Sequence, residues 1–251
     1  MINISAGSFG EIPIQLISKH IIPFIVITMT LFFGCSQESE ELAVIETDFG
    51  RIVIRFLEEE APKHVESFKI LAKEGYFNGT TFHRIVPGFV IQGGDPNSKD
   101  DDRSNDGNGG RAGKFYGVWD GKVADTWKSA QSNPDSWLLP AEFNELPHKR
   151  GAVSMARSQD PNSASSQFFI CVENAFRLDR KYSIFGEVVE GLDVADKIVN
   201  LDTPKKLNPK YRGNDADNPN NPVKMKVWLT TAKELNIILP NMDKPEPKRS
   251  P

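Results

Sequence analysis

Arg84 and Gln92 are the residues of this 251-residue chain whose surroundings point most directly to chemistry. Both lie in residues 82–95, where most other positions carry β-forming apolar side chains such as Phe89. A guanidinium has five N–H donors in a fixed arrangement and stays charged, so an arginine among apolar neighbours needs an internal acceptor or a cleft. Pro87-Gly88 interrupts the apolar pattern and predicts a turn or bulge beside both polar side chains.

Each candidate also has a purely structural interpretation. Arg84 could form an ion pair with Glu142 or Glu145, and Gln92 could cap the end of a strand. Periodicity alone would assign several apolar candidates to the core with about even odds: Phe89, Val90, Phe169 and Leu178.

Other kinds of catalytic or metal site find little support. The chain contains no G-x-S-x-G motif, and its four histidines and two cysteines form no cluster with metal-ligand spacing. Asp102, Ser104, Asp106 and Gly107 match the start of a calcium-binding loop, but Gly113 stands where a bidentate glutamate is needed. A solvated acidic loop is therefore the favoured interpretation, and no metal or cofactor is expected.

Charge and composition favour one globular domain that does not bind nucleic acid. The 30 basic and 34 acidic residues give a formal charge of -4 without a basic stripe. The domain is predicted to span residues 42–239, with long polar inserts near 96–139 and 203–222, and the tail 240–251 is predicted to be disordered.

Short strands and two short helices are predicted to position the candidate residues. A hairpin is expected around Thr47-Asp48-Phe49-Gly50, and further strands and helices follow the apolar patterns. Alternation along one strand would place Phe168 and Phe169 on opposite faces, one in the core and one at a surface pocket. The elements favour a mainly β fold, a closed antiparallel β-barrel capped by two helices. Their expected bounds are strands at 42–46, 51–57, 151–157, 166–172, 183–189 and 223–229, and helices from Pro62 to before Gly75 and at 192–199.

The N-terminus is predicted to be a targeting segment. Lys19-His20 precedes an apolar run, residues 21–34, of the length typical of a signal peptide. Residues 1–35 resemble a bacterial lipoprotein signal, in which Cys35 would be lipidated, and residues 36–41 would form a tether. An ordinary secretory signal or a short anchor is the alternative. Cys171, the other cysteine, is expected to be a core residue.

Four sequence runs together resemble the cyclophilin-type peptidyl-prolyl cis-trans isomerases. The runs are 82–95, Ser154-Met155-Ala156-Arg157, 162–170 and Tyr182-Ser183-Ile184-Phe185-Gly186, and the resemblance covers about residues 42–230. It implies an eight-stranded barrel with an external apolar groove. It also implies a catalytic Arg84, a proline pocket walled by Phe89 and Phe169, and a Gln92 that holds the substrate backbone.

The same resemblance implies a set of substrate-binding residues: His83, Val90, Ala156, Arg157, Phe176, Leu178 and Tyr182. Arg157 replaces an asparagine and Tyr182 a histidine common in the family. Arg177 stands where a tryptophan is often found, and Phe176 is expected to substitute for it through a local shift.

The expected activity is rotation about Xaa-Pro peptide bonds, which requires no cofactor. The protein is expected to be monomeric, to act on proline-containing polypeptides, and to be lipid-anchored in the bacterial cell envelope, facing the periplasm or the exterior. The alternative is a peptide-binding or chaperone module that uses the same groove with weak turnover.

Overall fold

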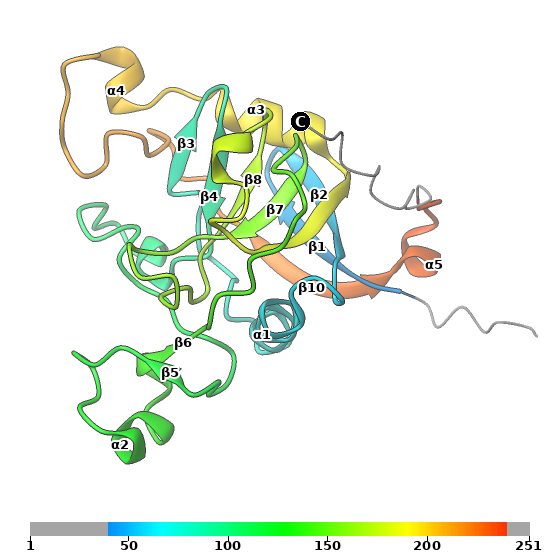
Figure 1. Ribbon diagram of the computed structural model, residues 1–251. Helices are drawn as coiled ribbons and strands as arrows, with labels where there is room; N and C mark the ends of the chain where they lie inside the picture. The colour runs from blue at the N-terminus through cyan, green and yellow to red at the C-terminus, as the bar shows by residue number, and fades with distance from the viewer. Residues whose placement is uncertain (1–39, 240–251) are drawn as a thin grey trace, which may run out of the picture. The chain divides into compact units, whose positions relative to one another are not determined.

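The computed structural model describes residues 40–239 (Figure 1). Cys35 with its signal segment, residues 36–39 of the tether, and the tail 240–251 lie outside the described residues. Within residues 40–239 the chain forms these strands: β1 Glu41–Thr47, β2 Gly50–Phe56, β3 Arg84–Val86, β4 Val90–Gly93, β5 Val118–Trp119, β6 Trp137–Leu138, β7 Ala152–Met155, β8 Phe168–Cys171, β9 Ile184–Glu190 and β10 Lys226–Thr231. Its α-helices are α1 Pro62–Lys73, α2 Trp127–Gln131, α3 Leu192–Val199, α4 Pro204–Leu207 and α5 Ala232–Leu235, and its 3-10 helices are η1 Pro96–Lys99, η2 Pro134–Ser136 and η3 Phe176–Leu178.

The sheet is antiparallel and eight-stranded, in the order β10-β1-β2-β9-β7-β8-β4-β3. It curls, as Figure 1 shows, but the closed barrel expected from the sequence is not confirmed. The segments that precede the edge strands β3 and β10 share an isolated bridge, Thr81 to Lys224, instead of a ladder. Neighbouring backbone bonds from Phe82 N to Val223 O (3.0 Å) and from Met225 N to Thr80 O (2.8 Å) hold the two edges near each other.

Local sequence signals account for most of the elements. The predicted hairpin joins β1 and β2, with Thr47 paired to Gly50, whose φ of 125° favours glycine. Helix α1 begins with Pro62. Proline has no backbone N–H, and the first N–H groups of a helix have no partner within the helix, so nothing is lost there. Helix α3 has the predicted bounds. The predicted turn at Pro87-Gly88 separates β3 from β4, and Gly88 has a φ of 71°.

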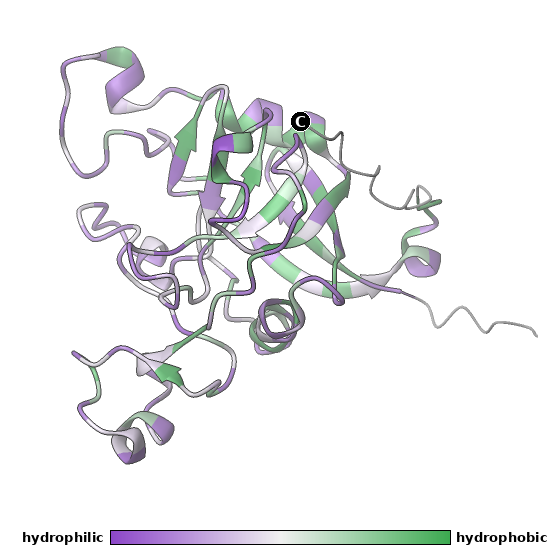
Figure 2. Ribbon diagram, viewed as in Figure 1, coloured by the Kyte–Doolittle hydropathy of each residue, from purple (hydrophilic) through white to green (hydrophobic). Residues whose placement is uncertain are grey.

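The core lies on the inner face of the curled sheet, beneath α1 and α3. In Figure 2 apolar and polar residues alternate along the strands, as a sheet with one buried face requires. Phe68 of α1 stands at the centre of a cluster of aromatic rings, with ring centroids 4.7 to 5.8 Å away in Phe56, Phe77, Phe168 and Phe185. Helix α1 therefore fixes the sheet around one buried phenylalanine.

The first insert, residues 96–139, has a small core of its own. The short strands β5 and β6 pair, and Phe115 contacts the rings of Trp119, Trp127 and Trp137. The indoles of Trp119 and Trp137 donate to the carbonyl oxygens of Ala124 and Ala130. Three of the chain's tryptophans thus fold a segment that the sequence predicted only as a long polar loop.

The second insert, residues 203–222, covers the outer edge of β3. Ile85 N of β3 donates to Asp217 O at 2.8 Å, so this backbone group of the edge strand is paired. The insert also meets the first one, because Asn218 donates to Asp106 at 2.7 Å and Asn214 donates to Ser104 O at 3.2 Å. The two inserts lie side by side at this edge.

The end of the described chain covers the outer face of the sheet beside β10. Leu235 and Ile237 pack with Trp228 against Leu42 and Val44. No helix within residues 40–239 is long and apolar enough to cross a membrane.

Replacing Phe68 by alanine should destabilise the protein strongly. The change leaves a cavity among four aromatic rings, and we expect a loss of about 3–5 kcal/mol in the free energy of unfolding. Urea unfolding followed by tryptophan fluorescence measures it. Phe49→Ala, at the exposed hairpin turn, is the control and should change stability by less than about 0.5 kcal/mol. Similar losses in both variants would contradict this account of the core.

Candidate active site

The antiparallel register places the main candidate residues in one row across the sheet. Arg84 of β3 pairs with Gln92 of β4, Gln92 with Phe169 of β8, and Phe169 with Ser154 of β7. Directly paired residues project from the same face of a sheet. The next row, Ile85, Ile91, Ile170 and Val153, projects to the opposite face and joins the main core. As predicted, Phe168 is a core residue, whereas Phe169 lies with the outer cluster.

A cavity of about 180 Å³ opens on this outer row. We call it the aromatic cavity, and it brings together most of the predicted site: Arg84, Phe89, Val90, Gln92, Ala156, Arg157, Phe169, Leu178 and Tyr182. The rings of Phe169 and Tyr182 meet edge to face, with centroids 5.6 Å apart. The cavity is thus a recess with aromatic and aliphatic walls, and three polar side chains, Arg84, Gln92 and Arg157, also line it.

A chain of hydrogen bonds fixes the polar margin. Arg84 Nη1 donates to Gln92 Oε1 at 3.4 Å, and Gln92 Nε2 donates to Gln167 Oε1 at 3.0 Å. Gln167 Nε2 then donates to Gly109 O of the first insert at 2.7 Å. Because each amide has both its donor and its acceptor engaged, the orientation of Gln92 toward Arg84 is defined.

Asp95 anchors the insert end of this chain of hydrogen bonds. Its carboxylate is buried and accepts from the backbone N–H groups of Asn97, Gly107 and Gly109. A side chain at position 109 would collide with it, since a Cβ there would lie 2.4 Å from Asp95 Oδ1. The insert therefore meets the candidate site through a tightly held loop, residues 105–110.

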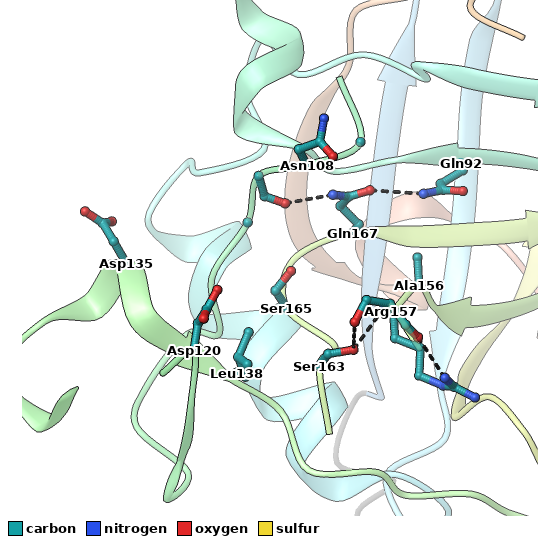
Figure 3. A pocket seen from close by; sticks show the side chains of 14 residues that line it. Gln92, Asn108, Asp120, Asp135, Leu138, Ala156, Arg157, Ser163, Ser165 and Gln167 are labelled. Atoms are coloured by element: carbon teal, nitrogen blue, oxygen red, sulfur yellow. Dashed lines mark hydrogen bonds between the residues drawn. The ribbon is translucent and has the colours of Figure 1, made fainter. Parts of the chain in front are cut away.

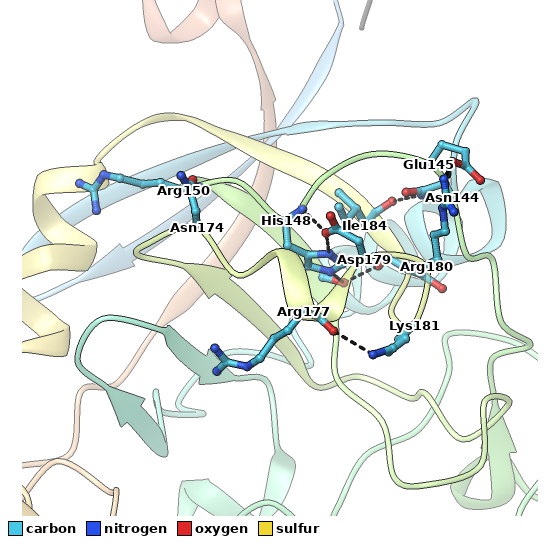
Figure 4. Close-up of polar contacts among 12 residues, drawn as sticks. Asn144, Glu145, His148, Arg150, Asn174, Arg177, Asp179, Arg180, Lys181 and Ile184 are labelled. Atoms are coloured by element: carbon cyan, nitrogen blue, oxygen red, sulfur yellow. Dashed lines mark hydrogen bonds and ion pairs between the residues drawn. The ribbon is translucent and has the colours of Figure 1, made fainter. Parts of the chain in front are cut away.

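His148 supports the floor of the aromatic cavity. Its imidazole stacks on Phe169, with ring centroids 6.0 Å apart and an angle of 18°. Nδ1 lies 3.0 Å from Asp179 Oδ1 (Figure 4), and Nε2 lies 3.3 Å from Ser154 Oγ. Burial lowers the pKa of His148, and Asp179 offsets part of that effect, so the imidazole is neutral near pH 7.

The Ser154–His148–Asp179 arrangement has the residue types of a hydrolase triad but not the access. Ser154 is fully buried, and its hydroxyl donates to Ser183 O at 2.9 Å. A nucleophile must reach a substrate carbonyl, which this hydroxyl cannot do. The group is a structural support for Phe169.

Two further arginines lie at the rim of the aromatic cavity. Arg157 lines the cavity, but its guanidinium donates to the carbonyl oxygens of Ser158, Gln159 and Lys181 and lies 4.6 Å from the Tyr182 ring centre. Arg177 lies over Phe89, with Cζ 4.0 Å from the ring centre. Its guanidinium covers an aromatic wall of the cavity by a cation–π contact.

Two predicted substrate-binding residues do not line the aromatic cavity. His83 is buried, and burial lowers its pKa; it lies beneath the 105–110 loop, near Gly107. Phe176 projects outward with 54% of its surface exposed, and Arg177 occupies the place over Phe89. Neither residue lines this cavity, so their part in substrate binding stays a prediction.

The structural alternative for Arg84 finds no support. Glu142 accepts from the backbone N–H groups of Lys63 and His64 at the start of α1, and Glu145 pairs with Arg180. Arg84 forms no ion pair with any residue in 40–239. Its Cζ lies 5.9 Å from the centre of the Phe89 ring, over the face of that ring. Its remaining donors are available to a bound molecule.

The acidic loop provides no evident metal site. Within residues 40–239 no three His, Cys, Asp or Glu side chains are placed to hold an ion. Asp102 accepts from the backbone and the hydroxyl of Ser104. Burial and the nearby Asp95 raise the pKa of Asp106 to about 6.

Sequence reasoning missed Gln167 and His148 as parts of this site. Gln167 precedes β8 and could have been found as a polar residue next to a predicted pocket strand. His148 had no such signal, because Asp179, its partner, lies 31 positions away along the chain.

A curled eight-stranded antiparallel sheet with an external aromatic recess and a flanking arginine defines the class of cyclophilin-like proteins. Residues 42–227 match the family described as cyclophilin type peptidyl-prolyl cis-trans isomerase/CLD, and the chain belongs to this family.

Similar proteins carry the same description. A probable peptidyl-prolyl cis-trans isomerase of Brucella abortus is 38% identical over 163 residues, which are 65% of this chain and 74% of that protein. A peptidyl-prolyl cis-trans isomerase of Acinetobacter baylyi is 32% identical over 178 residues, covering 69% and 79%. A cyclophilin type isomerase of Cryptosporidium parvum, solved in the presence of the dipeptide Ala-Pro, superposes with a TM-score of 0.58 at 25% identity, covering 76% of this chain and 99% of that one.

His148 should contribute to the loss of stability at acidic pH. Its pKa in the folded protein is lower than in the unfolded chain, so below about pH 6.5 the unfolded chain binds a proton that the folded protein does not. As the pH falls, His148 should then lower the free energy of unfolding by at most about 1.4 kcal/mol for each pH unit. In His148→Gln that part of the pH dependence should be absent.

Urea unfolding at pH 7 and pH 5.5 measures the difference. His64 and His83 are buried with lowered pKa values in both proteins, so their contributions cancel in the comparison. Equal losses of stability in wild type and variant would show that His148 does not titrate in this way.

Proposed function

We propose that this protein catalyses rotation about Xaa-Pro bonds in exported or envelope polypeptides. The observation that carries the proposal is the row Arg84–Gln92–Phe169 beside an apolar recess, on a fold of the cyclophilin family. Arg84, Phe89, Gln92 and Phe169 are the proposed catalytic residues. Val90, Ala156, Leu178 and Tyr182 would contact the substrate around them.

The chemistry requires no nucleophile. Rotation about a peptide bond is opposed by amide resonance, with a barrier of about 18–20 kcal/mol. In the twisted transition state the prolyl nitrogen becomes pyramidal and regains its lone pair. A donor directed at that nitrogen stabilises the transition state more than either planar ground state.

The described residues supply what this reaction needs. Phe89, Phe169 and Leu178 would hold the proline ring in the aromatic cavity while the acyl side turns. Gln92, oriented through Gln167, would bond to the peptide backbone. Arg84 would donate to the prolyl nitrogen, and the second arginine, Arg177, keeps Phe89 covered on its outer side.

Removing the guanidinium of Arg84 should abolish most of the activity. Losing one donor to developing electron density costs about 10²- to 10³-fold in rate, and we expect that fall in kcat/KM for Arg84→Ala on a short Xaa-Pro peptide. Arg51→Ala is the control, since Arg51 forms a surface ion pair with Glu190 on β9. It should keep the wild-type rate.

The same assay separates the two functions that the groove could serve. A wild-type protein that binds unfolded polypeptides but leaves the isomerisation rate of every peptide unchanged would overturn the proposal in favour of a peptide-binding module.

We also propose that the mature protein is held in the bacterial envelope by a lipid on Cys35. The apolar run before Cys35 supports this proposal. Cys35→Ser should move the protein from the membrane fraction to the soluble fraction of the expressing bacterium. Cys171→Ala is the control, because Cys171 is a buried thiol of β8, and it should stay with the membrane. Unchanged membrane association of Cys35→Ser would refute the anchor.

A further inference from the structure

A second cavity adjoins the aromatic cavity on the side of the first insert (Figure 3). We call it the insert cavity; its volume is about 270 Å³. Gln92, Ala156 and Arg157 line both cavities, so the two are adjacent. An extended peptide advances about 3.3 Å per residue, so a chain with its proline in one cavity can place a nearby side chain in the other.

The insert provides the far wall of this cavity. That wall consists of the loop around Asn108, the end of β6 at Leu138, and two carboxylates, those of Asp120 and Asp135. In Figure 3 both acidic residues lie across the cavity from Gln92 and Ala156. The wall is therefore not part of the curled sheet, and its charge belongs to the insert.

The segments that carry the two acids are tied together and to the domain. Asp120 N donates to Ser136 O at 2.8 Å, which joins the end of β5 to η2, where Asp135 lies. Leu139 N donates to Ala164 O at 2.7 Å and connects β6 to the loop before β8. The carboxylates are thus held at the cavity by a folded element and not by a loose loop.

The charges in the lining of the insert cavity do not cancel. Within residues 40–239 neither Asp120 nor Asp135 forms an ion pair. Arg157 is the one cation in the lining, and its guanidinium is turned away toward the carbonyl oxygens of Ser158, Gln159 and Lys181. Asp95 is buried and engaged by three backbone N–H groups. The rest of the lining is uncharged.

We infer that the insert makes this protein selective for substrates that carry a lysine or arginine a few residues from the isomerised proline. The basic side chain of the substrate occupies the insert cavity, and its cation lies near Asp120 and Asp135. The serine hydroxyls of the lining form hydrogen bonds with the substrate residues next to it. This inference rests on the proposed function and adds a substrate preference to it. The two partly solvated carboxylates affect how tightly the substrate binds, whereas Arg84 affects the rate of rotation.

Peptides with one Xaa-Pro bond test the inference. A single lysine, norleucine or glutamate is placed one, two or three residues before or after the proline, and kcat/KM is measured for each. Norleucine has the four-carbon side chain of lysine without the ammonium group. At one position we expect lysine to exceed norleucine about three- to tenfold, as weak, solvent-exposed ion pairs allow, and glutamate to fall below both. The preference should decrease with added salt.

The double variant Asp120→Asn/Asp135→Asn should remove the preference for lysine and leave the norleucine peptides unaffected. An amide at position 120 still provides the oxygen that accepts from Lys122 N, so the turn should be kept. Urea unfolding checks that the variant is folded. The matched control is Asp101→Asn, an exposed loop acid outside the cavity lining, which should behave as the wild type.

Three results would overturn the inference. The first is no preference for lysine at any position, and the second is a preference that survives in the double variant. The third is an equal preference at every position, which long-range attraction to a chain of charge -4 would produce. Failure of the proposed function looks different, since even the norleucine peptides would then isomerise at the uncatalysed rate. Binding of the same peptides, followed by fluorescence anisotropy, would still show or refute the charge preference in that case.

Discussion

The register of β3, β4 and β8 is the constraint on which the candidate site depends. Because side chains alternate between faces, one register puts Arg84, Gln92 and Phe169 together outside the sheet and their neighbours Ile85, Ile91 and Ile170 inside it. A shift by one residue would bury the guanidinium and expose three isoleucines. The burial of the isoleucines in the core thus determines where the polar residues lie, because one strand register sets both.

Residues with local signals could be predicted from the sequence. The turn at Gly88, the helix at 192–199 and the opposite faces of Phe168 and Phe169 follow from φ preferences and periodicity, which act over a few residues. The part of the site that follows from strand pairing, Arg84 with Gln92 and Phe169, came from the resemblance to a family whose register is already defined. Alternation on its own left Phe89 and Leu178 undecided between core and cavity.

The rest depends on contacts between distant segments. His148 stacks under Phe169 because the chain returns to Asp179, and no periodicity indicates that return. Phe176 was expected to substitute for a tryptophan through a local shift, but the guanidinium of Arg177 lies over Phe89 and Phe176 is exposed. The first insert was predicted as a polar loop because the four rings of its cluster, Phe115 and three tryptophans, are scattered along the sequence and come together only in the folded chain. The sheet is also open for a reason that the sequence does not indicate. Its two edges are joined by single backbone hydrogen bonds and an isolated bridge, and not by a regular ladder of paired strands.

The second insert has a consequence for a protein whose clients are extended chains. An unpaired strand edge is a template onto which any extended segment can add by backbone hydrogen bonding, regardless of its sequence. Strand β3, which carries Arg84, is such an edge, and unfolded polypeptides are brought close to it. Asp217 O occupies Ile85 N, so the protein's own backbone competes with clients for that edge. In the proposed function a client would be held by the groove, from which it can dissociate after one rotation, and would be kept from joining the sheet at Ile85.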